Sequence, residues 1–164
     1  MMQHQILQDS WVWNGIVSDF VRQYAHGRVL NVCAGLSDIG DVRIDLDPKN
    51  PDVIKADMNA IPYPNDSFDV VIEDPPWKIG FYKRMRPFFE AVRVCKVGGL
   101  IVYNAYWVPS SKATQLIRAV IRQDKPFTNT SIVSVLKKIT DDYDEPTRAA
   151  TSTASGNTKS SDAQ

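Results

Sequence analysis

The sequence predicts an α/β fold built on a mostly parallel sheet, and two patterns along the chain carry this prediction. Short apolar runs with little alternation recur along the chain, interspersed with segments of helical periodicity. Such runs are typical of strands buried on both faces of a parallel sheet that helices cover. Most of the runs end on glycine or aspartate. Because open α/β sheets bind ligands beyond the carboxyl ends of their strands, these positions are the first candidates for a site.

Periodicity places the elements in order along the chain. Gly27 is expected to end the first helix, and Gly98-Gly99 the second. The predicted helices are residues 10–25, 82–96 and 111–123. The predicted strands are residues 29–35, 42–47, 52–57, 68–73, 100–106 and 130–138.

Composition restricts the class of protein. The chain has 164 residues, of which 43% are hydrophobic, and 19 basic side chains balance 19 acidic ones. This length fits one domain with a sizeable core, which we expect over residues 1–140. Residues 141–164 are rich in Ser, Thr and charge and nearly empty of large apolar side chains, so a disordered tail is expected there.

Several classes of protein are excluded at this stage. No apolar run approaches the roughly 18–20 residues of a membrane span, and the N-terminus lacks the order of a signal peptide. Cys33 and Cys95 are too few for a disulfide framework, and no metal-ligand cluster surrounds them. A cytoplasmic protein without membrane contact or bound metal is therefore expected.

The balanced charge hides an asymmetry along the chain. Residues 1–77 hold 12 acidic and 5 basic side chains, whereas residues 78–140 hold 2 acidic and 12 basic ones. Such a chain can meet a polar or cationic cofactor on one side and an anionic partner on the other. The alternative is that both sets of charges are dispersed over solvated surfaces.

Gly35 and three aspartates follow the first three predicted strands. Gly35 allows a ligand to approach the backbone, and a carboxylate after the second strand, at Asp45 or Asp47, suits ribose hydroxyls. Asp57 follows the third strand, where its side chain can accept a hydrogen bond from an adenine amino group. Each residue also has a purely structural interpretation, since Gly after a strand and Asp before Pro are common in turns.

The sequence Asp74-Pro75-Pro76-Trp77 after the fourth strand is the most specific signal. An exocyclic amine on a nucleobase is a poor nucleophile because its lone pair is delocalised into the ring. The Asp74 carboxylate and the Pro75 carbonyl can accept both of its N–H bonds, and the two prolines fix these acceptors in place. Trp77 offers a face on which an unpaired base can stack. A structural interpretation would be a stiff loop with Trp77 in the core.

These motifs resemble those of the class I S-adenosylmethionine-dependent methyltransferases over residues 28–106, which implies a Rossmann-like sheet. The segments VLNVCAG, RIDLDP and the stretch from Asp57 to Trp77 are similar to the family's cofactor-binding and catalytic motifs. The last motif is similar to that of enzymes that methylate adenine N6 in DNA or RNA. The resemblance implies S-adenosylmethionine as cofactor and Asp74, Pro75, Pro76 and Trp77 as the catalytic residues. It implies a cofactor site made by Asn31, Ala34, Gly35, Asp45, Asp47, Asp57 and Met58.

The sequence also departs from the family. Asn31 replaces an acidic strand residue, and only residues 36–41 separate the first two strands, where the family has a helix. Either a loop crosses between parallel strands, or the strand pairing differs. Without that helix no helix N-terminus supports the cofactor's carboxylate, so cofactor binding is expected to be weak or completed by a partner subunit or homodimer.

Basic and aromatic residues that follow Trp77 indicate contact with a nucleic-acid backbone. The alternative is a solvated helix face over an aromatic core stripe. The candidate substrate-binding residues are Lys78, Tyr82, Lys83, Arg84 and Arg86. The function predicted is therefore methyl transfer to a nucleobase amine, most readily adenine N6 in DNA or RNA. Two alternatives stay open: a small-molecule or protein-amide acceptor, and a non-catalytic subunit that binds nucleic acid.

Overall fold

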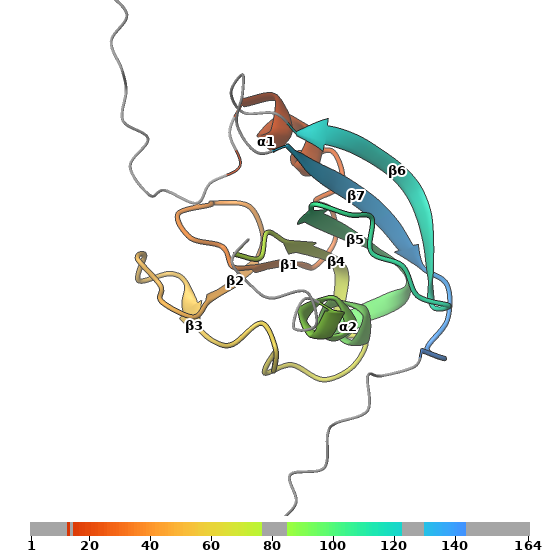
Figure 1. The fold of residues 1–164 in the computed structure, drawn as a ribbon. Helices are drawn as coiled ribbons and strands as arrows, with labels where there is room; N and C mark the ends of the chain where they lie inside the picture. The colour runs from red at the N-terminus through yellow and green to blue at the C-terminus, as the bar shows by residue number, and fades with distance from the viewer. Residues whose placement is uncertain (1–12, 14, 77–84, 123–129, 144–164) are drawn as a thin grey trace, which may run out of the picture.

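The protein is described by a computed structural model that places residue 13 and residues 15–76, 85–122 and 130–143. Two helices and seven strands form in this part of the chain (Figure 1). The helices are α1 (Gly15–Arg22) and α2 (Met85–Val94). The strands are β1 (Val29–Val32), β2 (Val42–Asp45), β3 (Ile54–Lys55), β4 (Phe68–Glu73), β5 (Cys95–Ala105), β6 (Thr114–Arg122) and β7 (Ser131–Lys138).

All seven strands belong to one sheet in the order β3-β2-β1-β4-β5-β7-β6. The pairings from β3 through β5 are parallel, whereas β7 pairs antiparallel with both β5 and β6. The carboxyl ends of β1 to β5 therefore lie at one edge of the sheet, and β6, which runs parallel to β5, ends at the same edge. The prediction of a mostly parallel α/β sheet is confirmed.

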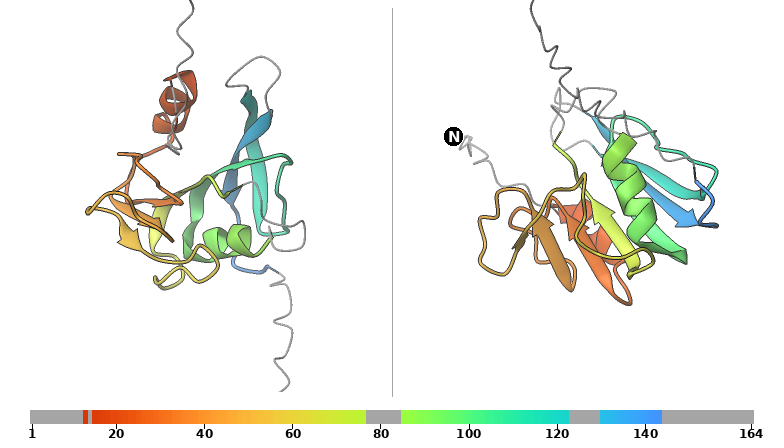
Figure 2. Two further views of the ribbon diagram at one scale, coloured as in Figure 1. Left: turned by 60° about the vertical axis from the view of Figure 1, so that its left-hand side comes forward. Right: turned by 90° about the horizontal axis from the view of Figure 1, so that it is seen from below.

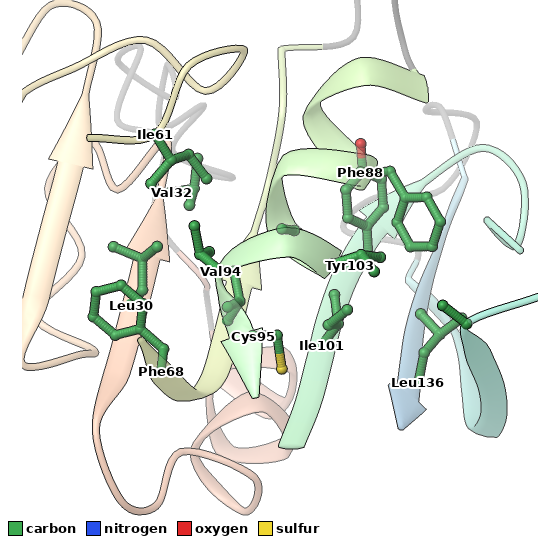
Figure 3. Close-up of a cluster of buried hydrophobic side chains, with 14 of the residues drawn as sticks. Leu30, Val32, Ile61, Phe68, Phe88, Val94, Cys95, Ile101, Tyr103 and Leu136 are labelled. Carbon is green, nitrogen blue, oxygen red and sulfur yellow. The ribbon is translucent and has the colours of Figure 1, made fainter. Parts of the chain in front are cut away.

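One helix covers each face of the sheet, as Figures 1 and 2 show. On the α1 face, Phe20 and Val21 pack on the side chains of the central strands, including Val70 and Val102. On the α2 face, apolar residues of β1, β4, β5 and β7 meet Phe88, and Figure 3 shows this second cluster. Because both faces of β4 are buried, its central residues 70–72 (VVI) are apolar without alternation, between the partly exposed Asp69 and the buried Glu73.

The connection between β1 and β2 is a loop, and the two strands are nevertheless parallel, with Leu30 paired to Val42. The expected loop crossover is therefore correct, and the alternative of a different pairing is not. Asn31 holds the loop from below, since its Nδ2 donates to Ser37 Oγ at 3.2 Å and to the Ile39 carbonyl at 3.0 Å.

The helix predicted over residues 111–123 is wrong, because Thr114–Arg122 form the strand β6. A short apolar run cannot be assigned to helix or strand by periodicity alone, and pairing with β7 decides it here. The second helix also ends earlier than predicted, at Val94. Gly98 and Gly99 then lie in the irregular start of β5, where a side chain on Gly99 would meet the Asp69 carbonyl oxygen at 2.6 Å.

The first residues of the predicted tail contact the domain. Asp141 and Asp142 form ion pairs with Lys138 and Lys112, and Tyr143 stacks on Phe89. Residues 144–164 lie outside the described part of the chain. Among the described residues no helix has the length and apolar character that a membrane span requires.

Candidate functional site

A pocket of about 220 Å³ opens at the carboxyl edge of the sheet, beyond the ends of β1 to β4. Three carboxylates that follow different strands meet there: Asp45 ends β2, Asp57 follows β3 and Asp74 follows β4. No lysine or arginine lines the pocket in the described part of the chain. The full lining is Val32, Cys33, Asp45, Leu46, Ala56, Asp57, Met58, Asn59, Asp74 and Pro76.

Asp45 organises the backbone at one end of the pocket. Its Oδ2 accepts the Gly35 N–H at 3.0 Å, and its Oδ1 accepts the Asp47 N–H at 2.9 Å. Gly35 has a φ of 52°, in the left-handed region that glycine adopts without strain. The carboxylate therefore ties the turn after β1 to the turn after β2.

Asp57 and its neighbours form the opposite wall. The Oδ1 atom of Asp57 accepts both the backbone N–H and the side-chain Nδ2 of Asn59, each at 2.8 Å. Met58 Sδ lies 3.5 Å from Cys33 Sγ, which closes the apolar floor between β1 and this loop. The loop is fixed from the α2 side, since Arg86 Nε donates to the Asn59 carbonyl at 3.1 Å.

Asp74 is held by two side chains from the far half of the sheet. Asn104 Nδ2 on β5 donates to Asp74 Oδ1 at 2.8 Å, and an Arg122 guanidinium nitrogen on β6 lies 3.3 Å from Oδ2. Arg122 in turn lies over the ring of Trp13, 5.6 Å from its centroid. The orientation of the Asp74 carboxylate therefore depends on β5 and β6.

Burial and neighbouring charge raise the pKa values of two further groups beside the pocket. Burial, with the nearby carboxylates Glu90 and Asp74, raises the pKa of Glu73 well above its usual value. Burial also raises the pKa of the Cys33 thiol, and the nearby Asp45, Asp74 and Asp57 carboxylates add to this effect. Cys33 is therefore a protonated thiol and no ready nucleophile.

The structure brings together some of the predicted site residues and separates others. Gly35 lies next to Asp45, whereas Ala34 is buried and donates its N–H to the Ile44 carbonyl. Asn31 is buried below the loop after β1, and Asp47 is exposed and ion-paired to Lys49, so neither lines the pocket. The residues that line the pocket as predicted are Asp45, Asp57, Met58, Asp74 and Pro76.

The predicted acceptor side is only partly described. Pro75 connects Asp74 to Pro76 but does not itself line the pocket. Arg86 is exposed and bonded to the pocket rim at Asn59. Trp77, Lys78, Tyr82, Lys83 and Arg84 lie outside the described residues.

Arg122 and Glu73 are among the residues of the site that were not predicted from the sequence. Arg122 was placed in a helix, and no local signal relates it to Asp74, 48 positions earlier. Glu73 was read only as the last residue of a strand, although an acidic side chain at the end of a run buried on both faces is itself unusual.

Comparison with known proteins reveals similarity in structure alone. No protein-family model matches the sequence, and no curated protein matches it significantly. The N-methyltransferase NodS from Bradyrhizobium japonicum WM9 superposes with a TM-score of 0.54 at 12% identity, over 75% of this chain and 94% of NodS. TrmN from Thermus thermophilus gives 0.52 at 16% identity, over 74% of this chain and 48% of TrmN. The cyclase SpnF gives 0.52 at 10% identity, over 75% of this chain and 80% of SpnF.

These likenesses define the fold. The chain has a Rossmann-like class I methyltransferase fold, in which the usual strand order is kept while the connections after β1 and β5 are loops. SpnF shares the fold and is a cyclase, so the fold does not fix the reaction. The chemistry has to be argued from the site.

Proposed function

We propose that the protein is an S-adenosylmethionine-dependent methyltransferase whose acceptor is an exocyclic amine of a nucleobase, most readily adenine N6 in DNA or RNA. One observation carries the proposal: Asp45, Asp57 and Asp74, which the sequence motifs assign to ribose, adenine and acceptor amine, line one pocket. NodS, which has a similar fold, is an N-methyltransferase, so the fold is compatible with this reaction class.

The charge of the pocket favours this cofactor over a phosphorylated one. Three carboxylates and no described basic residue line the pocket, which repels phosphate groups and attracts a cation. S-adenosylmethionine contains a sulfonium and no phosphate. Within the described residues no three His, Cys, Asp or Glu side chains are grouped so that they could hold a metal ion. An organic cation therefore fits the site better than a metal ion.

The residues present fit the parts of the cofactor. Asp45 would accept from ribose hydroxyls and the second oxygen of Asp57 from the adenine amine, while Leu46 and Met58 offer apolar contact to the ring. The volume of about 220 Å³ is below the range of about 300–1,000 Å³ usual for whole ligands, so the pocket would take the nucleoside part. When bound, the cofactor supplies an electrophilic methyl group.

On the acceptor side, Asp74 and the Pro75 carbonyl would accept the two N–H bonds of the amine and orient its lone pair. Asn104 and Arg122 fix the Asp74 carboxylate before the amine arrives, which lowers the reorganisation on reaching the transition state. A carboxylate oxygen can accept more than one hydrogen bond, so the amine can bind Asp74 beside these donors. Trp77 would stack on the base.

A second candidate function is a subunit that binds the cofactor or nucleic acid only with a partner. The loop crossover after β1 favours it, because no helix N-terminus faces the pocket from this connection. In this case a homodimer or another chain would complete the cofactor site. A small-molecule or protein-amide acceptor would keep the enzyme class and change only the outer part of the acceptor site.

Calorimetric titration with S-adenosylmethionine tests the cofactor site. Asp45→Ala is expected to lose binding, whereas Asp47→Ala, which removes an exposed carboxylate two residues away, should keep it. Asp74→Ala should keep cofactor binding and abolish methyl transfer to adenine-containing DNA and RNA. Unchanged transfer by Asp74→Ala would contradict the proposed catalytic role, and absence of binding by the isolated protein would favour the partner-dependent function.

Salt dependence separates the acceptor classes. Affinity for DNA or RNA falls steeply with salt because counterions are released from the phosphates on binding. A small-molecule acceptor would show little salt dependence, and its transfer rate would be nearly constant over the same range.

A further inference from the structure

Glu73 is the last residue of β4 and directly precedes Asp74. Its side chain is fully buried, and neither of its carboxyl oxygens has a hydrogen-bond partner. Burying a polar group without partners lowers the stability of a folded protein, so such a residue calls for an explanation. The sites at which proteins keep destabilising residues are commonly functional ones.

The position of Glu73 connects it to the pocket. It pairs with Val32 of β1 on one side and with Tyr103 of β5 on the other. Val32 and Asp74, its neighbours across the sheet and along the chain, both line the pocket. The Cys33 thiol, which also lines the pocket, is near enough to Glu73 to interact with it electrostatically. The carboxyl therefore lies beside the pocket wall.

The charged groups around Glu73 are mainly acidic. Asp74 on its own strand and Glu90 on α2 act on it directly, while Asp45 and Asp57 act on the adjoining Cys33. Two of these carboxylates have basic partners, because Arg122 pairs with Asp74 and Arg93 with Glu90. Tyr103 is the uncharged neighbour on β5. No cation acts on Glu73 itself among the described groups, so an added positive charge would stabilise its anionic form.

We infer that Glu73 is a specificity-determining residue of the cofactor site, which distinguishes the positively charged sulfonium cofactor from the uncharged thioether product. The inference rests on the proposed function. Full burial without hydrogen-bond partners favours the neutral acid of Glu73 in the ligand-free protein, and positive charge in the adjoining pocket favours its carboxylate. Its carboxyl therefore releases one proton to the solvent when S-adenosylmethionine binds. S-adenosylhomocysteine has no sulfonium, so Glu73 keeps its proton when the product is bound.

The change in charge at the site on methyl transfer favours release of the product. The bound pair is a carboxylate and a sulfonium before methyl transfer, and transfer removes the positive charge from sulfur. The Glu73 carboxylate then lies unpaired in a buried site and takes a proton back from the solvent. Product binding gains nothing from Glu73, so the product is held more weakly than the cofactor.

Isothermal titration calorimetry in buffers of different ionisation enthalpy measures the proton count directly. As the pH rises above about 4.5, S-adenosylmethionine binding is expected to release up to one proton and to tighten by up to about tenfold per pH unit, until Glu73 is ionised in the ligand-free protein as well. S-adenosylhomocysteine binding should release no proton from Glu73. Comparing the wild type with Glu73→Gln at each pH cancels any titration of the ligands themselves.

Glu73→Gln keeps the shape of the side chain and cannot ionise. We expect this variant to bind both ligands, to lose the extra proton release, and to have a ratio of the two affinities that does not vary with pH. Asp47→Asn is the matched control, because it removes an exposed carboxylate outside the pocket and should behave as the wild type.

Thermal unfolding without ligand provides a readout that needs no cofactor. The folded protein keeps the Glu73 proton that the unfolded chain releases above about pH 4.5, so wild-type stability should fall as the pH rises from there. The melting temperature of Glu73→Gln should exceed that of the wild type near neutral pH and approach it in acid. Equal pH dependence in both proteins would overturn the inference.

The failures of the two proposals are distinguishable. Binding of S-adenosylmethionine with the same proton release in the wild type and Glu73→Gln would overturn the role of Glu73 and leave the proposed function intact. No binding of either ligand at any pH would overturn the proposed cofactor site, and the role of Glu73 with it.

Discussion

Arg122 and Asp74 form an ion pair at the carboxyl edge of the sheet, with 3.3 Å between the guanidinium nitrogen and the carboxylate oxygen. The two residues lie on β6 and directly after β4, and β5 and β7 separate these strands in the sheet. Both side chains are only 10% exposed. The edge strand β6 thus positions the Asp74 carboxylate, to which we assign the acceptor amine.

Replacing Arg122 should impair methyl transfer far more than cofactor binding. Arg122→Met removes the charge that holds Asp74 Oδ2 and keeps the hydrogen bond from Asn104 to Oδ1. Misplacement of an orienting group by about 1 Å can lower a rate by about 100-fold, and a loss of this order is expected here. Steady-state transfer rates and calorimetric affinities for S-adenosylmethionine measure the two effects separately.

Arg118→Met is the control for this experiment. Arg118 lies on the same strand and its guanidinium lies over the Phe20 ring at 5.2 Å, much as Arg122 lies over Trp13. Asp74 is not among its described partners. If both variants lost activity equally, the loss would come from the aromatic contacts of β6 and not from Asp74.

The loop that carries Asp57 depends on Arg93 of α2. Arg93 donates to the carbonyls of Ile61 and Tyr63 at 2.9 and 2.7 Å, and Glu90 accepts the Ile61 N–H at 2.8 Å. Arg93→Met should destabilise the protein by about 2–4 kcal/mol, since it removes a donor from both carbonyls and takes the only described cationic partner from the partly buried Glu90. Urea unfolding measures the loss of stability.

The same substitution should loosen the pocket wall. Faster amide hydrogen exchange is expected across residues 57–63, with weaker binding of S-adenosylmethionine. Arg86→Met removes one hydrogen bond to the same loop, at Asn59, and should have a smaller effect on both measurements. Equal exchange in the wild type and Arg93→Met would show that the loop is fixed by its own turns.

The sequence was sufficient to locate the pocket because the relevant information is local. An aspartate at or just after the end of a parallel strand lies at the carboxyl edge of the sheet, and this rule brings Asp45, Asp57 and Asp74 to the pocket. The rule does not say which way a side chain turns after the strand ends. Asp47 therefore stayed a second candidate for the ribose after Asp45, although it faces solvent and Lys49.

The residues around Asp74 required knowledge of pairing between distant segments. The run that contains Leu116 and Ile121 fits a helix as well as a strand. Only its pairing register with β7 places Arg122 at the carboxyl edge of the sheet, beside Asp74. For Asn31, the resemblance to the family implied a place in the cofactor site. In the structure its buried side chain instead donates hydrogen bonds to the short loop between β1 and β2.

Lys138 should make the stability of the protein sensitive to alkaline pH. It is buried, and its Nζ donates to Asp66 Oδ1 at 2.9 Å, to the Cys95 carbonyl at 2.7 Å and to Asp141 Oδ1 at 2.6 Å. Burial by itself lowers the pKa of Lys138, but the hydrogen bonds to Asp141 and Asp66 outweigh it, and the pKa lies above 10.5.

A raised lysine pKa stabilises the folded state below the unfolded value of 10.5, and this stabilisation is lost as the pH rises through the folded value. Lys138→Met should therefore be less stable than the wild type near neutral pH, and the difference should shrink above about pH 11. Chemical unfolding at both pH values tests this. A difference that is constant with pH would indicate that Lys138 contributes by packing alone.

Asn31 should be essential for the fold through its amide nitrogen. Its Nδ2 donates to Ser37 Oγ and to the Ile39 carbonyl, and these bonds hold the only covalent connection between β1 and β2. Asn31→Asp introduces the acidic residue typical of the resembling family, but a carboxylate cannot donate and would face the Ile39 carbonyl in a buried site. We expect Asn31→Asp to lose about 3 kcal/mol or more of stability, and Asn31→Ala about 1–3 kcal/mol. Urea unfolding ranks the two variants. A more stable Asn31→Asp with tighter S-adenosylmethionine binding would instead place residue 31 in the cofactor site.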